Sequence, residues 1–119
     1  MTSTPGEFDL IAKYFAPLAA KGAFGFRDDA ACFEPSHGNE LVITQDAIAE
    51  DVHFHGDDPP DSIAAKALRV NLSDLAAKGA TPKWASLALG LGAGWSEAWV
   101  AGFARGLAQD LETYGLSLT

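Results

Sequence analysis

The feature that most constrains the fold of this chain is a long helix predicted over residues 63–78. Asp61 or Ser62 stands where an N-cap is expected, and Gly79 directly follows the helix, where a C-cap is favoured. The residues between are rich in Ala and Leu, which favour helix. Any fold assigned to the chain therefore has to contain this helix.

The predicted helix carries two polar faces. At about 100° per residue, two separate arcs hold polar side chains, Asn71, Asp74 and Lys78 on one and Lys66, Arg69 and Ser73 on the other. A simple surface helix needs only one polar face, so the first arc is predicted to look into a cleft, with Asp74 as the first functional candidate. The alternative is that both polar faces are exposed to solvent, on a helix at the edge of the domain.

Strands and a second long helix are predicted around this one. Residues 84–91 alternate with the period of a strand, and a helix is predicted from Ser96 and Glu97 through Leu111 to Gly115. Further elements are predicted as a short helix within residues 7–18, which Pro17 should end or kink near Phe15 or Ala16. Short strands are predicted at 30–33, 41–44 and 52–55, and another beginning at 116. This order indicates an α/β (α+β) sandwich, in which the two long helices cover a mixed sheet.

The composition is that of an ordinary globular domain. Of the 119 residues, 48% are hydrophobic and 20% charged, which predicts one domain with its own core. No apolar run approaches the roughly 20 residues that cross a bilayer. The opening residues lack the features of a signal peptide, and Cys32 is the single cysteine. We therefore expect a soluble cytoplasmic protein.

The net charge excludes some binding partners. The chain has 16 Asp and Glu residues against 8 Lys and Arg residues, so its net charge is -8. Such a charge repels nucleic acid and anionic lipid. We expect binding to neither nucleic acid nor membrane.

Carboxylates stand at the ends of several predicted elements. Asp28 and Asp29 follow a glycine-bearing turn, and Asp46 follows the strand at 41–44, so loops can bring them together. Clustered carboxylates repel one another unless a cation bridges them, and Mg²⁺ combines one or two carboxylates with waters and phosphates. An acidic protein can thus bind an anionic nucleotide. The alternative is that these aspartates only form turns or caps.

Thr44, His53 and His55 are the other polar candidates. Thr44 offers a hydroxyl to a metal or its bound water, although threonine is also a good strand former. His53 and His55 have a spacing that occurs in metal sites, but no cysteine or third histidine completes a zinc set. We prefer one histidine as a contact to an anionic substrate, against the alternative of a solvent-facing pair. No glycine-rich phosphate loop of either common type is present.

Several motifs together resemble the thiamine-monophosphate kinase family. They are Gly6-Glu7-Phe8-x-Leu10-Ile11, Asp28-Asp29-Ala30-Ala31, Thr44-x-Asp46, Val52-His53-Phe54 and the block 66–82. Their order and spacing match over nearly the whole chain, and the part from Val70 to Pro82 is the most specific. That family belongs to the superfamily of aminoimidazole ribonucleotide synthetase, whose N-terminal α/β domain pairs its sheet with that of a partner subunit.

The resemblance implies an activity and a site. The activity is ATP-dependent phosphorylation of thiamine monophosphate to thiamine diphosphate, with several Mg²⁺ ions and a homodimer. The implied site has Mg²⁺ ligands at Asp29, Thr44, Asp46 and Asp74, a thiamine phosphate contact at His53, and support from Asp28 and Asn71. No catalytic base is expected, because the attacking phosphate is already anionic and the reaction needs positioning and charge neutralisation.

The chain departs from the family pattern at three places. Arg27 stands where many members have glycine, and Gln45 where threonine is common. Thr119 ends the chain where the family runs into a Gly-Gly-Asp-Thr segment, so we expect residues 1–119 to be a truncated ATP/Mg-binding and dimerisation domain, inactive alone. The alternatives are a related superfamily enzyme with another phosphate-bearing acceptor, or a non-catalytic dimerisation or nucleotide-binding module.

Overall fold

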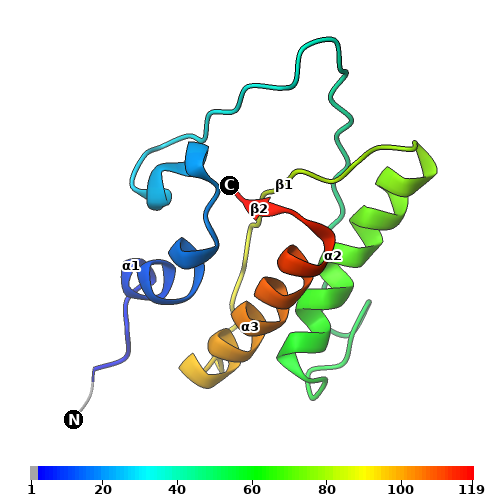
Figure 1. Cartoon of the computed structure of the whole chain (residues 1–119). Helices are drawn as coiled ribbons and strands as arrows, with labels where there is room; N and C mark the ends of the chain where they lie inside the picture. The colour runs from blue at the N-terminus through cyan, green and yellow to red at the C-terminus, as the bar shows by residue number, and fades with distance from the viewer. Residues whose placement is uncertain (1–2) are drawn as a thin grey trace.

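The computed structural model describes residues 3–119 (Figure 1). Its elements in chain order are α1 (Glu7–Leu10), the π-helical turn η1 (Ile11–Phe15), the 3-10 turns η2 (Ala16–Leu18) and η3 (Lys21–Phe26), α2 (Pro60–Ala77), β1 (Trp84–Ala85), α3 (Glu97–Tyr114) and β2 (Ser117–Leu118). Figure 1 shows α2 and α3 side by side, and a long connection, residues 27–59, that arches from the N-terminal turns to the start of α2. Within residues 3–119, no helix is both long and apolar enough to span a bilayer.

The two long helices predicted from the sequence are confirmed as α2 and α3. The N-cap of α3 is Ser96, whose hydroxyl accepts a hydrogen bond from the Trp99 N–H at 3.1 Å, and its C-cap is Gly115 in the left-handed conformation. These are the residues at which the sequence predicted the helix to begin and end.

The start of α2 differs from the prediction. The helix begins at Pro60 with Pro59 in the N-cap position, so the N-cap predicted at Asp61 or Ser62 is wrong. Proline suits the first helical position because its φ is already helical and the N–H it lacks would have no partner there. The Ser62 hydroxyl instead donates to the carbonyl of Pro59 at 2.8 Å.

Packing between α2 and α3 forms the core. The buried apolar side chains are Ile63, Ala64 and Leu68 from α2 and Val100, Phe103, Ala104, Leu107 and Leu111 from α3. Gly106 lets the helices approach closely, because a Cβ at this position would lie 2.5 Å from the backbone of Asp61. A larger residue at 106 would therefore push the helices apart.

An ion pair also joins the two helices. The guanidinium of Arg69 on α2 donates two hydrogen bonds to Asp110 on α3, from Nε to Oδ2 at 2.8 Å and from a terminal nitrogen to Oδ1 at 2.9 Å. Asp110 is 3% exposed, and the bidentate geometry raises the pKa of Arg69. The second polar arc of α2 thus contacts α3 through Arg69, although the Arg69 side chain stays more than half exposed.

The sheet is small and parallel. Trp84 of β1 pairs with Ser117 of β2, and Ala85 pairs with Leu118. Ala19 forms a further parallel bridge to Leu118, which brings the N-terminal turns beside β2. The observed fold is therefore a helix pair with a small parallel sheet.

Most of the predicted mixed sheet does not form within residues 3–119. Residues 30–33, 41–44 and 52–55 are not strands, and the predicted strand at 84–91 is paired only at its first two residues. Leu41, Val42 and Ile43 are 56%, 42% and 86% exposed, so the prediction of a buried strand there is wrong for this chain alone. A strand needs a hydrogen-bonded neighbour, and the described residues provide none for this segment.

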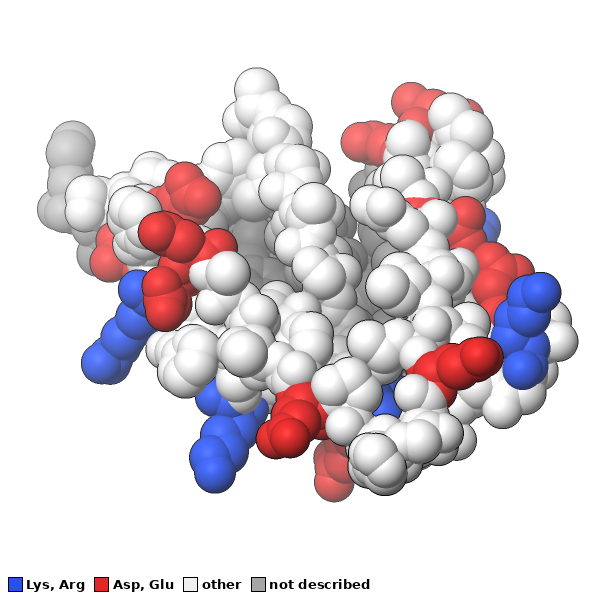
Figure 2. All heavy atoms as spheres, turned by 90° about the horizontal axis from the view of Figure 1, so that it is seen from above, with Lys and Arg blue, Asp and Glu red and all other residues white. Residues whose placement is uncertain are grey.

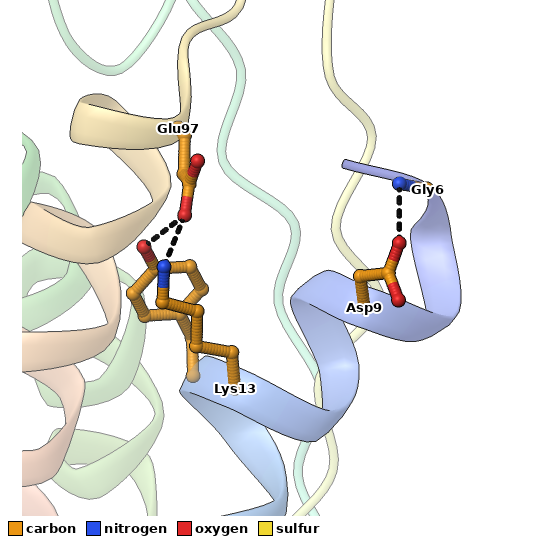
Figure 3. Close-up of polar contacts among 5 residues, drawn as sticks. Gly6, Asp9, Lys13 and Glu97 are labelled. Carbon is orange, nitrogen blue, oxygen red and sulfur yellow. Dashed lines mark hydrogen bonds and ion pairs between the residues drawn. The ribbon is translucent and has the colours of Figure 1, made fainter. Parts of the chain in front are cut away.

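The short helix predicted at residues 7–18 is broken into three turns, α1, η1 and η2. Pro17 lies in the last of them, where its missing N–H ends the regular helical hydrogen bonding. Figure 3 shows the Gly6 N–H donating to the Asp9 carboxylate at 3.0 Å at the start of α1.

Glu97 at the start of α3 fastens these N-terminal turns to the helix pair. Its Oε1 accepts from the Lys13 ammonium and from the Tyr14 hydroxyl, each at 2.6 Å (Figure 3). The hydrogen bond from Lys13, and next that from Tyr14, lowers the pKa of Glu97, and the same contact raises the pKa of Lys13.

The molecule is more open than a compact domain of its length. Its radius of gyration is 15.1 Å, whereas about 13.5 Å is typical for a compact domain of this size. A cavity of about 550 Å³ separates the N-terminal turns, at Leu10 and Ile11, from Leu87 and Leu89 beyond β1. The sheet side of the molecule is thus incompletely covered by the described residues.

Candidate functional site

Thr44 and Asp74 are brought together by the fold although 30 residues separate them. The Thr44 hydroxyl approaches Oδ2 of Asp74 at 3.4 Å as a long, weak hydrogen bond, whereas about 2.5–3.0 Å is usual between two oxygen atoms. Asp74 lies in the last turns of α2 and is exposed, while Thr44 lies in the long connection and is half-buried. The connection therefore runs past the first polar arc of α2, the one predicted to face a cleft.

Asp28 and Asp29 lie on a loop whose ends are fastened together. The Cys32 N–H donates to the carbonyl of Gly22 at 2.8 Å. A Cβ at residue 22 would overlap the carbonyl oxygen of Cys32, so only glycine permits this closure. Inside the loop, the Asp28 carboxylate accepts from the backbone N–H of Asp29 at 2.8 Å, which fixes the first carboxylate beside the second.

A cavity of about 270 Å³ opens beside these two aspartates. Asp28 and Asp29 line it together with Ser86, just after β1, and Thr119, just after β2. The Thr119 hydroxyl is bonded to the carbonyl of Ala85 at 3.1 Å. Carboxylate and hydroxyl oxygens thus meet at the end of the small sheet, and neither Ser86 nor Thr119 was identified from the sequence.

His53 lies in a tight turn of the connection, shortly before α2. Its backbone N–H donates to the carbonyl of Ala49 at 2.9 Å, and its ring Nδ1 accepts from the Ala49 N–H at 3.0 Å. Because Nδ1 accepts, the proton of the neutral ring is on Nε2, which leaves Nε2–H as a donor. His55 is exposed and contributes its backbone N–H to Asp58.

Asn71 lies on the same arc of α2 as Asp74, one turn earlier. Its Nδ2 donates to the carbonyl of Ala67 at 3.0 Å, which assigns Oδ1 as the opposite atom of the amide. Oδ1 is buried and has no hydrogen-bond partner among residues 3–119. An acceptor in this state is available to a donor that joins the site.

The predicted ligand set is only partly assembled. Thr44 and Asp74 are in contact, whereas Asp28 and Asp29 line a cavity that neither of those two residues lines. Asp46 is exposed with no side-chain hydrogen bond among the described residues. Over residues 3–119, no three or more His, Cys, Asp or Glu side chains are grouped to hold a metal. The Thr44 and Asp74 oxygens still suit Mg²⁺, which takes few protein ligands and fills its shell with water and phosphate.

The surface is predominantly acidic. On the face drawn in Figure 2, red acidic side chains gather in several places and blue basic ones are sparse. This distribution follows from the net charge of -8. An anionic ligand would therefore need cations to accompany it to this protein.

Lys66 and Asp110 are contact residues that sequence reasoning missed. The Lys66 ammonium donates to the backbone carbonyl of His53, and Asp110 holds Arg69. For Lys66 the signal was the second polar arc of α2. For Asp110 the signal was its position three residues after Leu107, on the buried stripe of α3.

The chain matches a known protein family and is similar to curated proteins. The model for AIR synthase related protein, N-terminal domain, matches residues 27–119. Three curated relatives are each named thiamine-monophosphate kinase. The one from Caulobacter vibrioides is 45% identical over 116 residues, which is 96% of this chain and 33% of that protein. Those from Haemophilus influenzae and Escherichia coli are each 40% identical over 116 residues, covering 95% of this chain and 35% of each protein. The chain thus spans about a third of the length of these relatives.

Proposed function

We propose that this chain is part of a kinase that phosphorylates thiamine monophosphate with ATP to give thiamine diphosphate. The chain belongs to the family of AIR synthase related proteins, and residues 27–119 match the N-terminal domain of that family. The observation that carries the proposal is the convergence of two separate motifs on α2. Thr44 contacts Asp74 near the end of the helix, and the His53 turn is fastened to Lys66 near its start. Similarity to the thiamine-monophosphate kinases along nearly the whole chain supports the same reaction.

In this proposal Thr44 and Asp74 hold Mg²⁺, with Asn71 supporting them through its unpaired Oδ1. Asp46 joins them from the same connection, and Asp29, supported by Asp28, contributes from the cavity that it lines with Ser86 and Thr119. When bound, Mg²⁺ supplies positive charge to the phosphates of ATP and of the acceptor. The residues themselves orient the reactants, and no general base is needed because the acceptor phosphate is an anion.

His53 binds the phosphate of thiamine monophosphate in this proposal. Its Nδ1 accepts from the Ala49 N–H, so Nε2–H is the donor that the ring has left for an anion. A hydrogen bond to a phosphate oxygen is charge-assisted and therefore stronger than one to a neutral acceptor. His55, whose side chain has no hydrogen bond among the described residues, is left out of the site.

The exposed apolar stretch at Leu41, Val42 and Ile43 supports a homodimer. Adding a strand from a second copy would satisfy its backbone groups and cover these side chains. We therefore propose that the sandwich, in which two long helices cover a mixed sheet, is completed by dimerisation and by the rest of the protein. Residues 1–119 then form the N-terminal ATP-binding and dimerisation part of a cytoplasmic enzyme.

Release of ADP by the full-length protein tests the proposed reaction. With ATP, Mg²⁺ and thiamine monophosphate, we expect ADP and thiamine diphosphate in equal amounts. Turnover with another phosphate-bearing acceptor, but none with thiamine monophosphate, would point to a related enzyme of the superfamily. Binding of nucleotide without any turnover would point to a non-catalytic module. Residues 1–119 alone should release no ADP, and turnover by this part would contradict its assignment as an incomplete site.

A further inference from the structure

The turn that carries His53 depends on few contacts. Residues 49–54 are joined by hydrogen bonds between Ala49 and His53 and by one from the Asp51 N–H to the carbonyl of Phe54 at 2.8 Å. Asp51 has φ of 62°, a left-handed conformation that non-glycine residues adopt at a cost. Val52, His53 and Asp51 are exposed, whereas Phe54 is half-buried and packs against the apolar core.

One contact ties this turn to the rest of the molecule at His53 itself. The Lys66 ammonium, on the exposed side of α2, donates to the backbone carbonyl of His53. Three polar groups of His53 are thus hydrogen-bonded. Its backbone N–H and ring Nδ1 bond to Ala49, and its carbonyl accepts from Lys66. The remaining polar atom of His53 is Nε2, which carries the proton of the neutral ring when Nδ1 accepts.

We propose that Lys66 is a positioning residue, which holds the 49–54 turn on α2 so that His53 keeps its Nε2–H tautomer and offers that donor to a phosphate. The proposal rests on the proposed function for the identity of the phosphate, but the tautomer and the turn are properties of the protein alone. Lys66 lies two turns of α2 before Asp74, so one rigid helix sets the placement of the phosphate donor relative to the Thr44 and Asp74 pair.

The geometry distinguishes this role from a direct contact between Lys66 and the substrate. A lysine that only supplied charge to the phosphate would leave the His53 turn unchanged when removed. If Lys66 positions the turn, its removal should weaken the hydrogen bond from the Ala49 N–H to Nδ1 of His53. The tautomer of His53 should then change even without substrate. The state of the imidazole therefore reports the positioning role separately from binding.

The test uses full-length protein with ¹⁵N-labelled histidine, observed by NMR above the pH at which the imidazole is protonated. In the wild type we expect an unprotonated Nδ1 and a protonated Nε2 at His53, and a change at Nε2 when inorganic phosphate is added. Lys66→Met should mix the tautomers and weaken phosphate binding about tenfold, the loss expected for one misplaced charge-assisted hydrogen bond. Lys66→Arg, which keeps a donor, should restore both signals.

Lys21→Met, at another exposed lysine, is the matched control and should leave both signals unchanged. An unaltered His53 tautomer in a folded Lys66→Met protein would overturn the positioning role, whatever happens to phosphate binding. Failure of the wild type to phosphorylate thiamine monophosphate would instead overturn the proposed function, and the tautomer comparison would still decide the role of Lys66.

Discussion

The helix pair and the long connection of residues 27–59 are built in opposite ways. The pair, α2 and α3, buries an apolar stripe from each helix, closes at Gly106 and is joined by the Arg69 to Asp110 ion pair. The connection contains no paired strand apart from one short bridge and leaves most of its side chains exposed. Yet the connection carries most of the candidate site residues, namely Asp28, Asp29, Thr44, Asp46 and His53.

The helix pair and the connection therefore have different roles in the protein. α2 and α3 pack directly against each other, whereas the connection is held by a few polar contacts with α2 and by the packing of Ile48 and Phe54 against the core. Thr44 meets Asp74, and the carbonyl of His53 meets Lys66. Stability and site geometry are therefore expected to respond to different substitutions.

The largest expected effect is on stability, in the helix pair. Leu107→Ala removes a side chain that is 4% exposed between α3 and α2, and should lower the free energy of unfolding by about 2–5 kcal/mol. Leu41→Ala in the connection should change it by no more than about 0.5 kcal/mol while the chain is monomeric. Chemical denaturation of both variants measures the contrast, and equal losses would remove the distinction between the two regions.

Next comes the effect of Asp74→Asn on activity. The substitution removes the charge that α2 contributes beside Thr44 and should lower kcat/KM of the full-length enzyme on the order of a hundredfold. Its melting temperature should stay near that of the wild type, because Asp74 is exposed. Asp57→Asn, in a turn before α2, is the control and should keep full activity. Unchanged kinetics for Asp74→Asn would exclude Asp74 from the proposed metal site.

A smaller loss is expected from Asp110→Asn. An asparagine can keep one hydrogen bond to Arg69 but loses the bidentate ion pair, and the expected cost is about 1–2 kcal/mol because Arg69 is more than half exposed. Thermal unfolding measures the change. Glu112→Gln, at an exposed position two residues later on α3, serves as the control and should be neutral. An equal effect of both variants would show that the ion pair does not join the helices.

The smallest expected effect is a pH dependence at Glu97. The hydrogen bonds from Lys13 and Tyr14 lower the pKa of Glu97 below its ordinary value of 4.5. Stability from this contact is therefore fully present above pH 4.5 and is lost as the pH falls through the lowered pKa of the folded protein. Melting curves of wild type and Glu97→Gln should differ above pH 4.5 and converge below it. A difference that persists at low pH would mean that the carboxylate charge does not hold the N-terminal turns.

Sequence reasoning predicted the helix pair because its signals are local. The spacing of Val100, Phe103 and Leu107 defines a buried stripe, and Ser96 and Gly115 mark the ends of α3. The pattern of Leu41, Val42 and Ile43 is equally regular, but burial of a strand depends on neighbours that are distant in sequence or lie in another chain. The predicted sheet therefore differs from the one observed.

The candidate site was predictable as a set of residues but not as an arrangement. Thr44 and Asp74 were each identified, yet nothing in their spacing of 30 residues gives their distance. Lys66 was visible as part of a second polar arc, but its partner is a backbone carbonyl, which every residue has and no sequence pattern reveals. Ser86 and Thr119 reach the cavity of Asp29 only through the pairing of β1 with β2.

A double-mutant cycle between Thr44→Val and Asp74→Asn measures whether the connection and α2 form one functional site. The quantity measured is kcat/KM for phosphorylation of thiamine monophosphate by the full-length enzyme, with wild type, both single variants and the double variant. If the two side chains act together, their effects should be non-additive by more than about 0.5 kcal/mol. Effects that add within this margin would show that Thr44 and Asp74 act independently, and would contradict a shared site on α2.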